Sequence, residues 1–180
     1  VLRKRYPFPR RVYLRTLMRT IRRATAADIE TIMRLIDSGR HIMRADGNLH
    51  QWEEGYPKQE TIIQDVANGN AYLVMDQAEP VATFALIAGP DPTYHLIYNG
   101  AWRHDTPYYV IHRIASLPQA HGVLSDVLSY CFSRTSHIRI DTHRDNRIMR
   151  KLLARNGFDY CGIIHLANGD ERLAFEKTKM

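Results

Sequence analysis

The feature that most constrains the fold is the run at residues 108–116, which reads YYVIHRIAS and is followed at once by a loop and a helical pattern. Its β-branched and aromatic residues predict a strand. Pro118 ends that run, and residues 122–134 show the spacing of apolar side chains that an amphipathic helix needs. Because such a helix must bury its apolar face, we expect it to cover a β-sheet.

Other segments extend this pattern along the chain. Thr25 with Asp28 resembles a capping box, and Asn156-Gly157 and Asn168-Gly169-Asp170 are typical of a helix end and a hairpin turn. Helices are predicted from about residue 26 into the forties and at 58–69, 122–134 and 146–155. Strands are predicted at 20–23, 71–76, 80–89, 108–116 and 137–142, and a closing hairpin at 159–177. The order predicts an α/β chain with a mixed sheet covered by helices.

Charge is unevenly distributed over the 180 residues. Residues 1–23 contain nine Lys or Arg and no acid, so the remainder holds 16 basic and 19 acidic residues. We interpret residues 1–17 as a disordered or non-native basic extension and 18–180 as one domain; binding of the extension to nucleic acid or an anionic membrane is the weaker hypothesis. No apolar run is long enough to span a bilayer. Two separated cysteines, Cys131 and Cys161, indicate a cytoplasmic protein with reduced thiols.

Three pieces of the chain resemble the GNAT superfamily of acyl-CoA N-acyltransferases over about residues 19–178. The first is the loop Gln119-Ala120-His121-Gly122, similar to the family's Q/R-x-x-G-x-G/A motif. The second is the segment at 141–158, DTHRDNRIMRKLLARNGF, in which an Asn precedes a helix that ends in Gly-Phe, and the third is the order of elements. The resemblance implies a mixed, mostly antiparallel twisted sheet of about six to seven strands, with helices on both faces.

The resemblance also implies acetyl-CoA as cosubstrate, with its diphosphate at the loop. A helix N-terminus offers unpaired N–H groups and a favourable dipole, and Gly122 lets the main chain approach a phosphate. The expected cofactor-binding residues of the loop are Gln119, His121, Gly122, Val123, Leu124 and Ser125. Leu124 replaces the family's last small residue. A plain strand-to-helix connection is the alternative interpretation of this loop.

Two further places complete the expected cofactor site. In the family, the Asn at the position of Asn146 contacts the pantetheine arm, although helix capping alone also explains an Asn there. A main-chain N–H near Ile114 or Ala115 is the expected donor to the oxyanion. Leu153 occupies the position at which the family often has a proton-donating tyrosine.

For the proton transfers the sequence offers His112 and Tyr160 as catalytic candidates. An imidazole titrates near neutral pH, and His112 lies on the strand expected beside the thioester. Strict alternation would place Tyr108, Val110, His112 and Ile114 on one face. The alternatives are a histidine bonded to its own sheet and a tyrosine that packs in the core.

We expect the acceptor site to come from the loop at 47–57 and the long segment at 90–107, with Trp52, Tyr56, Trp102 and Tyr108 as substrate-binding residues. No metal-ligand spacing is visible, and the other histidines are expected at the surface. The predicted function is N-acetylation of a primary amine of a small molecule or peptide by direct attack. The alternative is a non-catalytic acyl-CoA-binding or sensory domain, and a homodimer is an assembly that the sequence allows.

Overall fold

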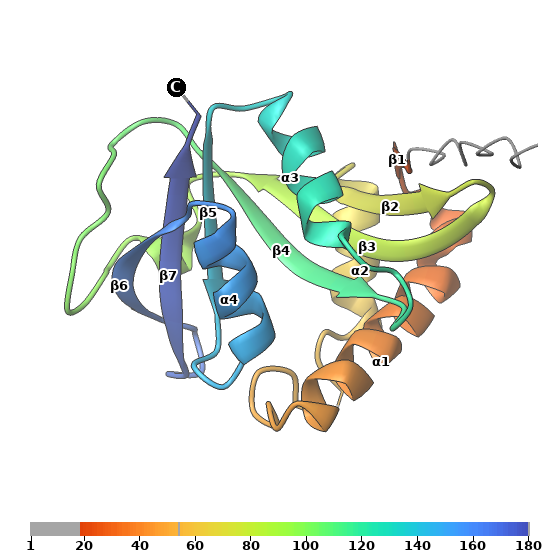
Figure 1. The fold of residues 1–180 in the computed structure, drawn as a ribbon, viewed down its shortest axis with the longest axis horizontal. Helices are drawn as coiled ribbons and strands as arrows, with labels where there is room; N and C mark the ends of the chain where they lie inside the picture. Colours follow the sequence, from red (N-terminus) through yellow and green to blue (C-terminus); the bar gives the residue numbers. More distant parts are fainter. Residues whose placement is uncertain (1–18, 54, 180) are drawn as a thin grey trace, which may run out of the picture.

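The computed structural model describes residues 19–53 and 55–179, which include one seven-stranded sheet (Figure 1). The strand order is β1-β2-β3-β4-β5-β7-β6, and every neighbouring pair is antiparallel except β4 and β5. The strands are β1 (Thr20–Arg23), β2 (Ala71–Asp76), β3 (Glu79–Ala88), β4 (Tyr109–Ser116), β5 (His137–Thr142), β6 (Asp159–His165) and β7 (Glu171–Thr178). The mixed, mostly antiparallel sheet predicted from the sequence is therefore confirmed.

The sheet opens between its two parallel strands. β4 and β5 pair only where Tyr109 faces Ile138 and Val110 faces Arg139. Beyond these residues the strands diverge, and in Figure 1 β4 runs away from β5 toward the lower right. The gap lies at the carboxyl ends of parallel strands, where ligands bind in many α/β proteins.

A β-bulge in β4 lies beside this opening. Thr83 of β3 pairs with Ala115 and Ala85 pairs with His112, so two residues of β4, Arg113 and Ile114, stand opposite one residue of β3. Arg113 adopts a φ of 55°, a conformation that is uncommon for a residue with a side chain. The bulge breaks the expected alternation: His112 stays on one face of the sheet, while Ile114 packs on the other.

Four α-helices cover the two faces of the sheet. α1 (Ile29–Ala45) and α2 (Gln59–Ala67) pack on one face around Leu73 and Ala115. α3 (Val123–Phe132) and α4 (Arg147–Arg155) cover the other face, and α3 is centred on the fully buried Val127 (Figure 1). The segment at 89–108, with the short 3-10 helix η2 (Pro92–Tyr94), packs Tyr94 against Val110 on the α1 face.

Most of the predicted elements are present near their predicted limits. Thr25 and Asp28 form the reciprocal capping box, although it opens the short 3-10 helix η1 (Ala26–Asp28) ahead of α1. Both cysteines are free and buried, and burial raises the pKa of Cys131 to about 12. The expected basic extension at 1–17 lies outside the described residues. Among the residues that the structure describes, no helix combines the length and apolar character needed to cross a membrane.

Candidate functional site

The loop between β4 and α3 ends in a left-handed residue. Gly122 is the N-cap of α3 with a φ of 79°. A Cβ built on Gly122 would meet no atom within 4 Å. Glycine is therefore needed here for its backbone conformation, because a residue with a side chain pays a steric cost at positive φ.

Three consecutive N–H groups at this helix start have no acceptor among the described residues: those of Gly122, Val123 and Leu124. The N–H groups on either side of these three are already engaged, since that of His121 donates to Gln119 O at 3.1 Å and that of Ser125 to Gly122 O at 3.0 Å. The three free groups border a cavity of about 390 Å³. This end of the site can therefore receive an anion through main-chain donors.

A positive charge lies beside this helix start. Arg19 donates to His121 O at 2.7 Å and to Asp126 Oδ2 at 3.1 Å, and it also lies 3.4 Å from Asp76. Asp126 is in the first turn of α3. Its negative charge would repel a phosphate, and Arg19 neutralises it. Sequence reasoning missed Arg19 because it is 102 positions away from the loop that it contacts.

The apolar wall of this cavity explains how Leu124 fits. Leu124 is 5% exposed and packs in the apolar cluster beneath α3. Its main-chain N–H, which remains free, is the group that an anion would need. Leu153 is fully buried in the same cluster. The position at which the family often has a tyrosine therefore lies in the core and not at the cleft.

A second cavity, of about 280 Å³, continues the first through the opening between β4 and β5. Four residues line both cavities: Met43, Ile114, Asn146 and Met149. Asn146 accepts the N–H of Met149 at 3.0 Å, which caps α4, and its Nδ2 donates to Gln51 Oε1 at 2.8 Å. Asn146 therefore both caps α4 and lines the cavities. The two cavities adjoin at these four shared residues, and together they are called the cleft below.

A histidine in contact with a carboxylate lies in the wall of the second cavity. His112 Nε2 lies 3.0 Å from Asp91 Oδ2, and both side chains are less than one-fifth exposed. Burial acts to raise the pKa of Asp91, but hydrogen bonds from His112 and from Thr93 outweigh it and hold the pKa at about 2. A carboxylate that is ionised at neutral pH orients the ring through this contact. His112, oriented by Asp91, therefore has the chemistry that a general base requires.

A tyrosine holds the second carboxylate of this cavity. The hydroxyl of Tyr94 donates to Asp141 Oδ2 at 2.8 Å. Complete burial, followed by the charge of Asp141, raises the pKa of Tyr94 well above its usual value. Tyr94 is therefore a hydrogen-bond donor here and stays protonated. Its ring stacks on Trp102 and lies 6.3 Å from the ring of His112.

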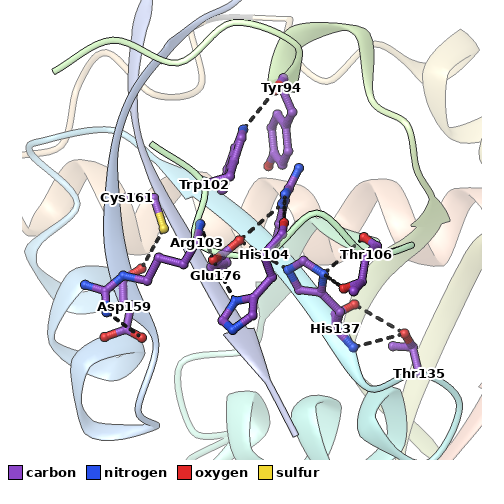
Figure 2. A network of polar contacts seen from close by, with 11 residues as sticks. Tyr94, Trp102, Arg103, His104, Thr106, Thr135, His137, Asp159, Cys161 and Glu176 are labelled. Atoms are coloured by element: carbon purple, nitrogen blue, oxygen red, sulfur yellow. Dashed lines mark hydrogen bonds and ion pairs between the residues drawn. The ribbon is translucent and has the colours of Figure 1, made fainter. Parts of the chain in front are cut away.

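The segment that carries these groups is tied to the sheet through one buried carboxylate (Figure 2). Glu176 Oε1 accepts the N–H of Arg103 at 2.6 Å and lies 3.0 Å from His104 Nδ1. Glu176 Oε2 lies 3.2 Å from His137 Nε2. Hydrogen bonds from these groups offset the effect of burial and lower the pKa of Glu176. The network therefore attaches the later part of the 89–108 segment, which also carries Asp91 and Tyr94, to β5 and β7.

The structure places three of the predicted site residues outside these two cavities. Trp102 and Tyr108 line a third cavity, of about 790 Å³, which also contains Asp91, and the Arg139 guanidinium lies 4.0 Å from the centroid of each ring. Tyr108 instead helps to position Asp91, whose N–H donates to its hydroxyl at 3.1 Å. Tyr160 lies half-exposed on β6 in a separate groove of about 600 Å³ beside α4. The reason is the sheet order, which places β7 between β6 and β5.

The remaining predictions meet at the cleft. His112, Trp52 and Tyr56 line the second cavity. Ile114 lines both cavities. Gln119 precedes the free amides in the loop, and the rest of the predicted cofactor residues line the first cavity: Ala115, His121, Gly122, Val123, Leu124, Ser125 and Asn146. Whether these residues bind coenzyme A stays a prediction.

The polar residues of the second cavity that are absent from the predicted site include Gln51, Asp91, Asp141 and Arg172. Gln51 Oε1 accepts from Asn48, Thr142 and Asn146 at 2.8–3.2 Å and so joins the loop after α1 to α4. Only Asp141 carried a signal, its place at the end of a predicted strand. The others come from separate loops and from the last strand, so no local pattern brings them together.

One of the histidines that were expected at the surface is buried in the structure. His137 is buried, and together with His104 and Glu176 it forms a group whose possible metal-ligand atoms all lie within 4.8 Å of one another. Arg139 Nε lies 3.4 Å from Glu176 Oε2, and a guanidinium at that distance disfavours a cation. The absence of a metal site stays a prediction.

Comparison with solved structures places this cleft in a known family. An acetyltransferase of the GNAT family from Streptococcus agalactiae is 34% identical, with a TM-score of 0.81, and the match covers 90% of this chain and 96% of that one. A GNAT-family acetyltransferase from Listeria monocytogenes is 18% identical, with a TM-score of 0.66 and coverages of 89% and 95%. A chain of the NatC complex bound to Gag peptide and CoA is 11% identical, with a TM-score of 0.56 and coverages of 90% and 99%.

No protein-family model matches the chain, and no curated protein matches it in sequence. The 34% identity over nearly the whole of both chains is nevertheless sufficient: the chain belongs to the GNAT family of acetyltransferases. The two more distant structures share its fold. Membership of this family supports acyl transfer as the general chemistry of the protein.

Proposed function

We propose that this protein transfers an acetyl group from acetyl-CoA to a primary amine of a small molecule or peptide, by direct attack through a tetrahedral intermediate. One observation carries the proposal. A single cleft has free main-chain amides of α3 at one end and the His112–Asp91 pair at the other, and the bulge of β4 lies between them. An anionic carrier and an amine acceptor would approach from opposite ends.

The carrier end supplies hydrogen-bond donors and an apolar surface. The N–H groups of Gly122, Val123 and Leu124 would bind the diphosphate, with the helix dipole adding to the attraction. Asn146 and Met149, which line both cavities, would border the pantetheine arm as it enters the opening between β4 and β5. Binding of this kind needs no cationic side chain from the loop itself.

The bulge is the proposed site of oxyanion stabilisation. An extra residue in one strand interrupts the ladder and leaves a backbone group without its partner across the strands. Here the extra residue lies at Arg113 and Ile114, beside the opening. We assign the oxyanion donor to the main chain at Ile114 or Ala115, where it would stabilise the charge that develops on the thioester oxygen.

His112 is the proposed base. It would accept the proton that the attacking ammonium loses, and Asp91 would stabilise the imidazolium that forms. Three features favour His112 over other groups as the base: Tyr160 lies in another groove, residue 153 is a buried leucine, and Tyr94 is fully buried with a raised pKa, so it stays protonated. The thiolate of coenzyme A is a good leaving group, so its departure requires little help.

The experiment is thiol release from acetyl-CoA, measured with a broad panel of amines and one peptide for each class of N-terminal residue. We expect amine-dependent release, and product mass increased by one acetyl group. Coenzyme A that binds without turnover of any amine would contradict the proposal and favour the binding or sensory domain instead. We further propose a cytoplasmic protein that works without a metal; a homodimer remains a hypothesis.

A further inference from the structure

One buried arginine of the second cavity is the starting point. Arg172 lies on β7, and its side chain is 5% exposed. It borders the cavity that also contains the His112–Asp91 pair. Burying a charge is costly unless an opposite charge compensates for it, so the partners of this guanidinium need to be identified.

The hydrogen bonds of Arg172 go to main-chain oxygens. Nη1 donates to Glu171 O at 2.9 Å and Nη2 to Gln51 O at 3.3 Å. Of the carboxylates in the described residues, the nearest is that of the half-exposed Asp170, at 3.8 Å. That distance is outside hydrogen-bond range. The positive charge of Arg172 is therefore held in place but weakly neutralised.

The other two arginines buried in the sheet show a different pattern. Arg113 forms two hydrogen bonds of 2.8 Å with the carboxylate of Asp65. Arg139 is stacked between two aromatic rings and lies 3.4 Å from buried Glu176. Each of them has an anion that belongs to the fold. Arg172 has none at that distance within the described residues. Arg113 also lines the acceptor cavity, but its charge is paired with Asp65, whereas Arg172 faces the cavity without such a partner.

The lining of the cavity therefore carries both signs of charge. Asp91 and Asp141 are acidic, and both are held by hydrogen bonds from neighbouring side chains. They would attract an ammonium group to the side of His112 and repel an anion from it. Arg172 would instead attract an anionic group and repel an ammonium group. A ligand that complements both the carboxylates and the guanidinium carries an amine and an acidic group in one molecule.

We propose that the acceptor is a small amine that also bears a carboxylate, and that Arg172 binds the carboxylate. A guanidinium matches the two oxygens of a carboxylate with parallel N–H donors. The volume of about 280 Å³ is at the lower end for ligand sites and suits an acceptor of amino-acid size. Arg172 is thus a specificity-determining residue. This inference rests on the proposed function, because it names the substrate class of the same site.

The test compares matched pairs of acceptors that differ only in charge. The α-amino acids, β-alanine and γ-aminobutyrate are each assayed with acetyl-CoA against their amides. We expect a higher kcat/KM for at least one acid than for its amide, by roughly tenfold to a hundredfold. In Arg172→Met this preference should disappear, and Arg172→Lys should restore part of it. Arg144→Met, which removes an exposed arginine paired with Glu171, should leave it unchanged.

Calorimetric titration of the same acids and amides into the CoA-loaded protein separates binding from turnover, and thermal unfolding checks that each variant folds. Turnover of amines with no preference for the acids, or a preference that survives in Arg172→Met, overturns the inference and leaves the proposed function intact. Binding of the acids that depends on Arg172 without any turnover supports the inference but contradicts the proposed function. Absence of both binding and turnover contradicts both.

Discussion

The two ends of the cleft are built from different parts of the chain. At the carrier end the functional groups are main-chain amides of three consecutive residues, and their placement depends on one left-handed glycine. At the acceptor end they are side chains from β4, β5, β7 and two loops, and each is held by hydrogen bonds to another segment. The first end should therefore tolerate most changes of side chain, while the second should not.

This difference predicts how each end responds to mutation. A change of backbone conformation should weaken carrier binding and leave acid–base chemistry alone. Loss of a single side chain at the other end should reduce turnover and leave carrier binding alone. The bulge of β4 joins the two, so a change there should affect both ends together.

The largest effect is expected for His112→Ala, which removes the proposed base. Turnover should fall by about 10²- to 10⁴-fold, while the dissociation constant for coenzyme A stays within about twofold. Steady-state kinetics and calorimetry measure the two quantities. Tyr160→Phe is the matched control and should retain full activity because Tyr160 lies in a separate groove. An active His112→Ala protein would remove His112 from the mechanism.

Asp65→Ala tests the junction between the two ends. It leaves Arg113 of the bulge as an unpaired buried charge, which should lower the free energy of unfolding by about 3–5 kcal/mol. Urea denaturation measures this value. The double variant Asp65→Ala with Arg113→Met removes both charges and should recover part of the loss. If the double variant is no more stable than the single one, the ion pair does not support the bulge in the way described.

Asp91→Asn should change how stability depends on pH. The pKa of Asp91 is lowered from 3.8 to about 2, so its stabilising effect is present above about pH 4 and is lost as the pH falls through about 2. The effect corresponds to roughly 2 kcal/mol at neutral pH. We therefore expect the wild type and Asp91→Asn to differ by this amount at pH 6 and to converge only below about pH 2. A difference that stays constant over this range contradicts the assignment.

Gly122→Ala is expected to have the smallest effect, and it comes with a matched control. Gly122 and Gly169 have φ values of 79° and 88°, and neither has an atom near its missing Cβ. Both alanine variants should lose about 1–2 kcal/mol of folding free energy or shift the local backbone. Only Gly122→Ala should weaken coenzyme A binding, by about tenfold. Equal weakening in both variants would mean that the helix start is not the phosphate site.

The same contrast explains which parts of the molecule can be predicted from the sequence. The carrier loop is local: a strand, a glycine and a helix follow one another within 25 residues, so periodicity and turn chemistry are enough to find it. Asn146 is also local, as a helix cap. The GNAT fold followed from the order of such elements.

The acceptor end has no comparable local signal. Asp91 and His112 are 21 positions apart, and Gln51 contacts Asn146 across 95 positions. Aromatic residues were only a partial guide, because Trp52 and Tyr56 line the second cavity, whereas Trp102 and Tyr108 line a third one and contact Arg139. The bulge was also not predictable, since strict alternation gives no reason for an arginine with positive φ.

The central claim is that the free amides at the start of α3 bind the diphosphate of coenzyme A. A crystal structure of the protein grown with coenzyme A tests it directly. We predict diphosphate oxygens within hydrogen-bond distance of the N–H groups of Gly122, Val123 and Leu124, with the thiol beside Ile114. Coenzyme A bound elsewhere, for example in the groove beside Tyr160, or an empty cleft at saturating ligand would contradict the account.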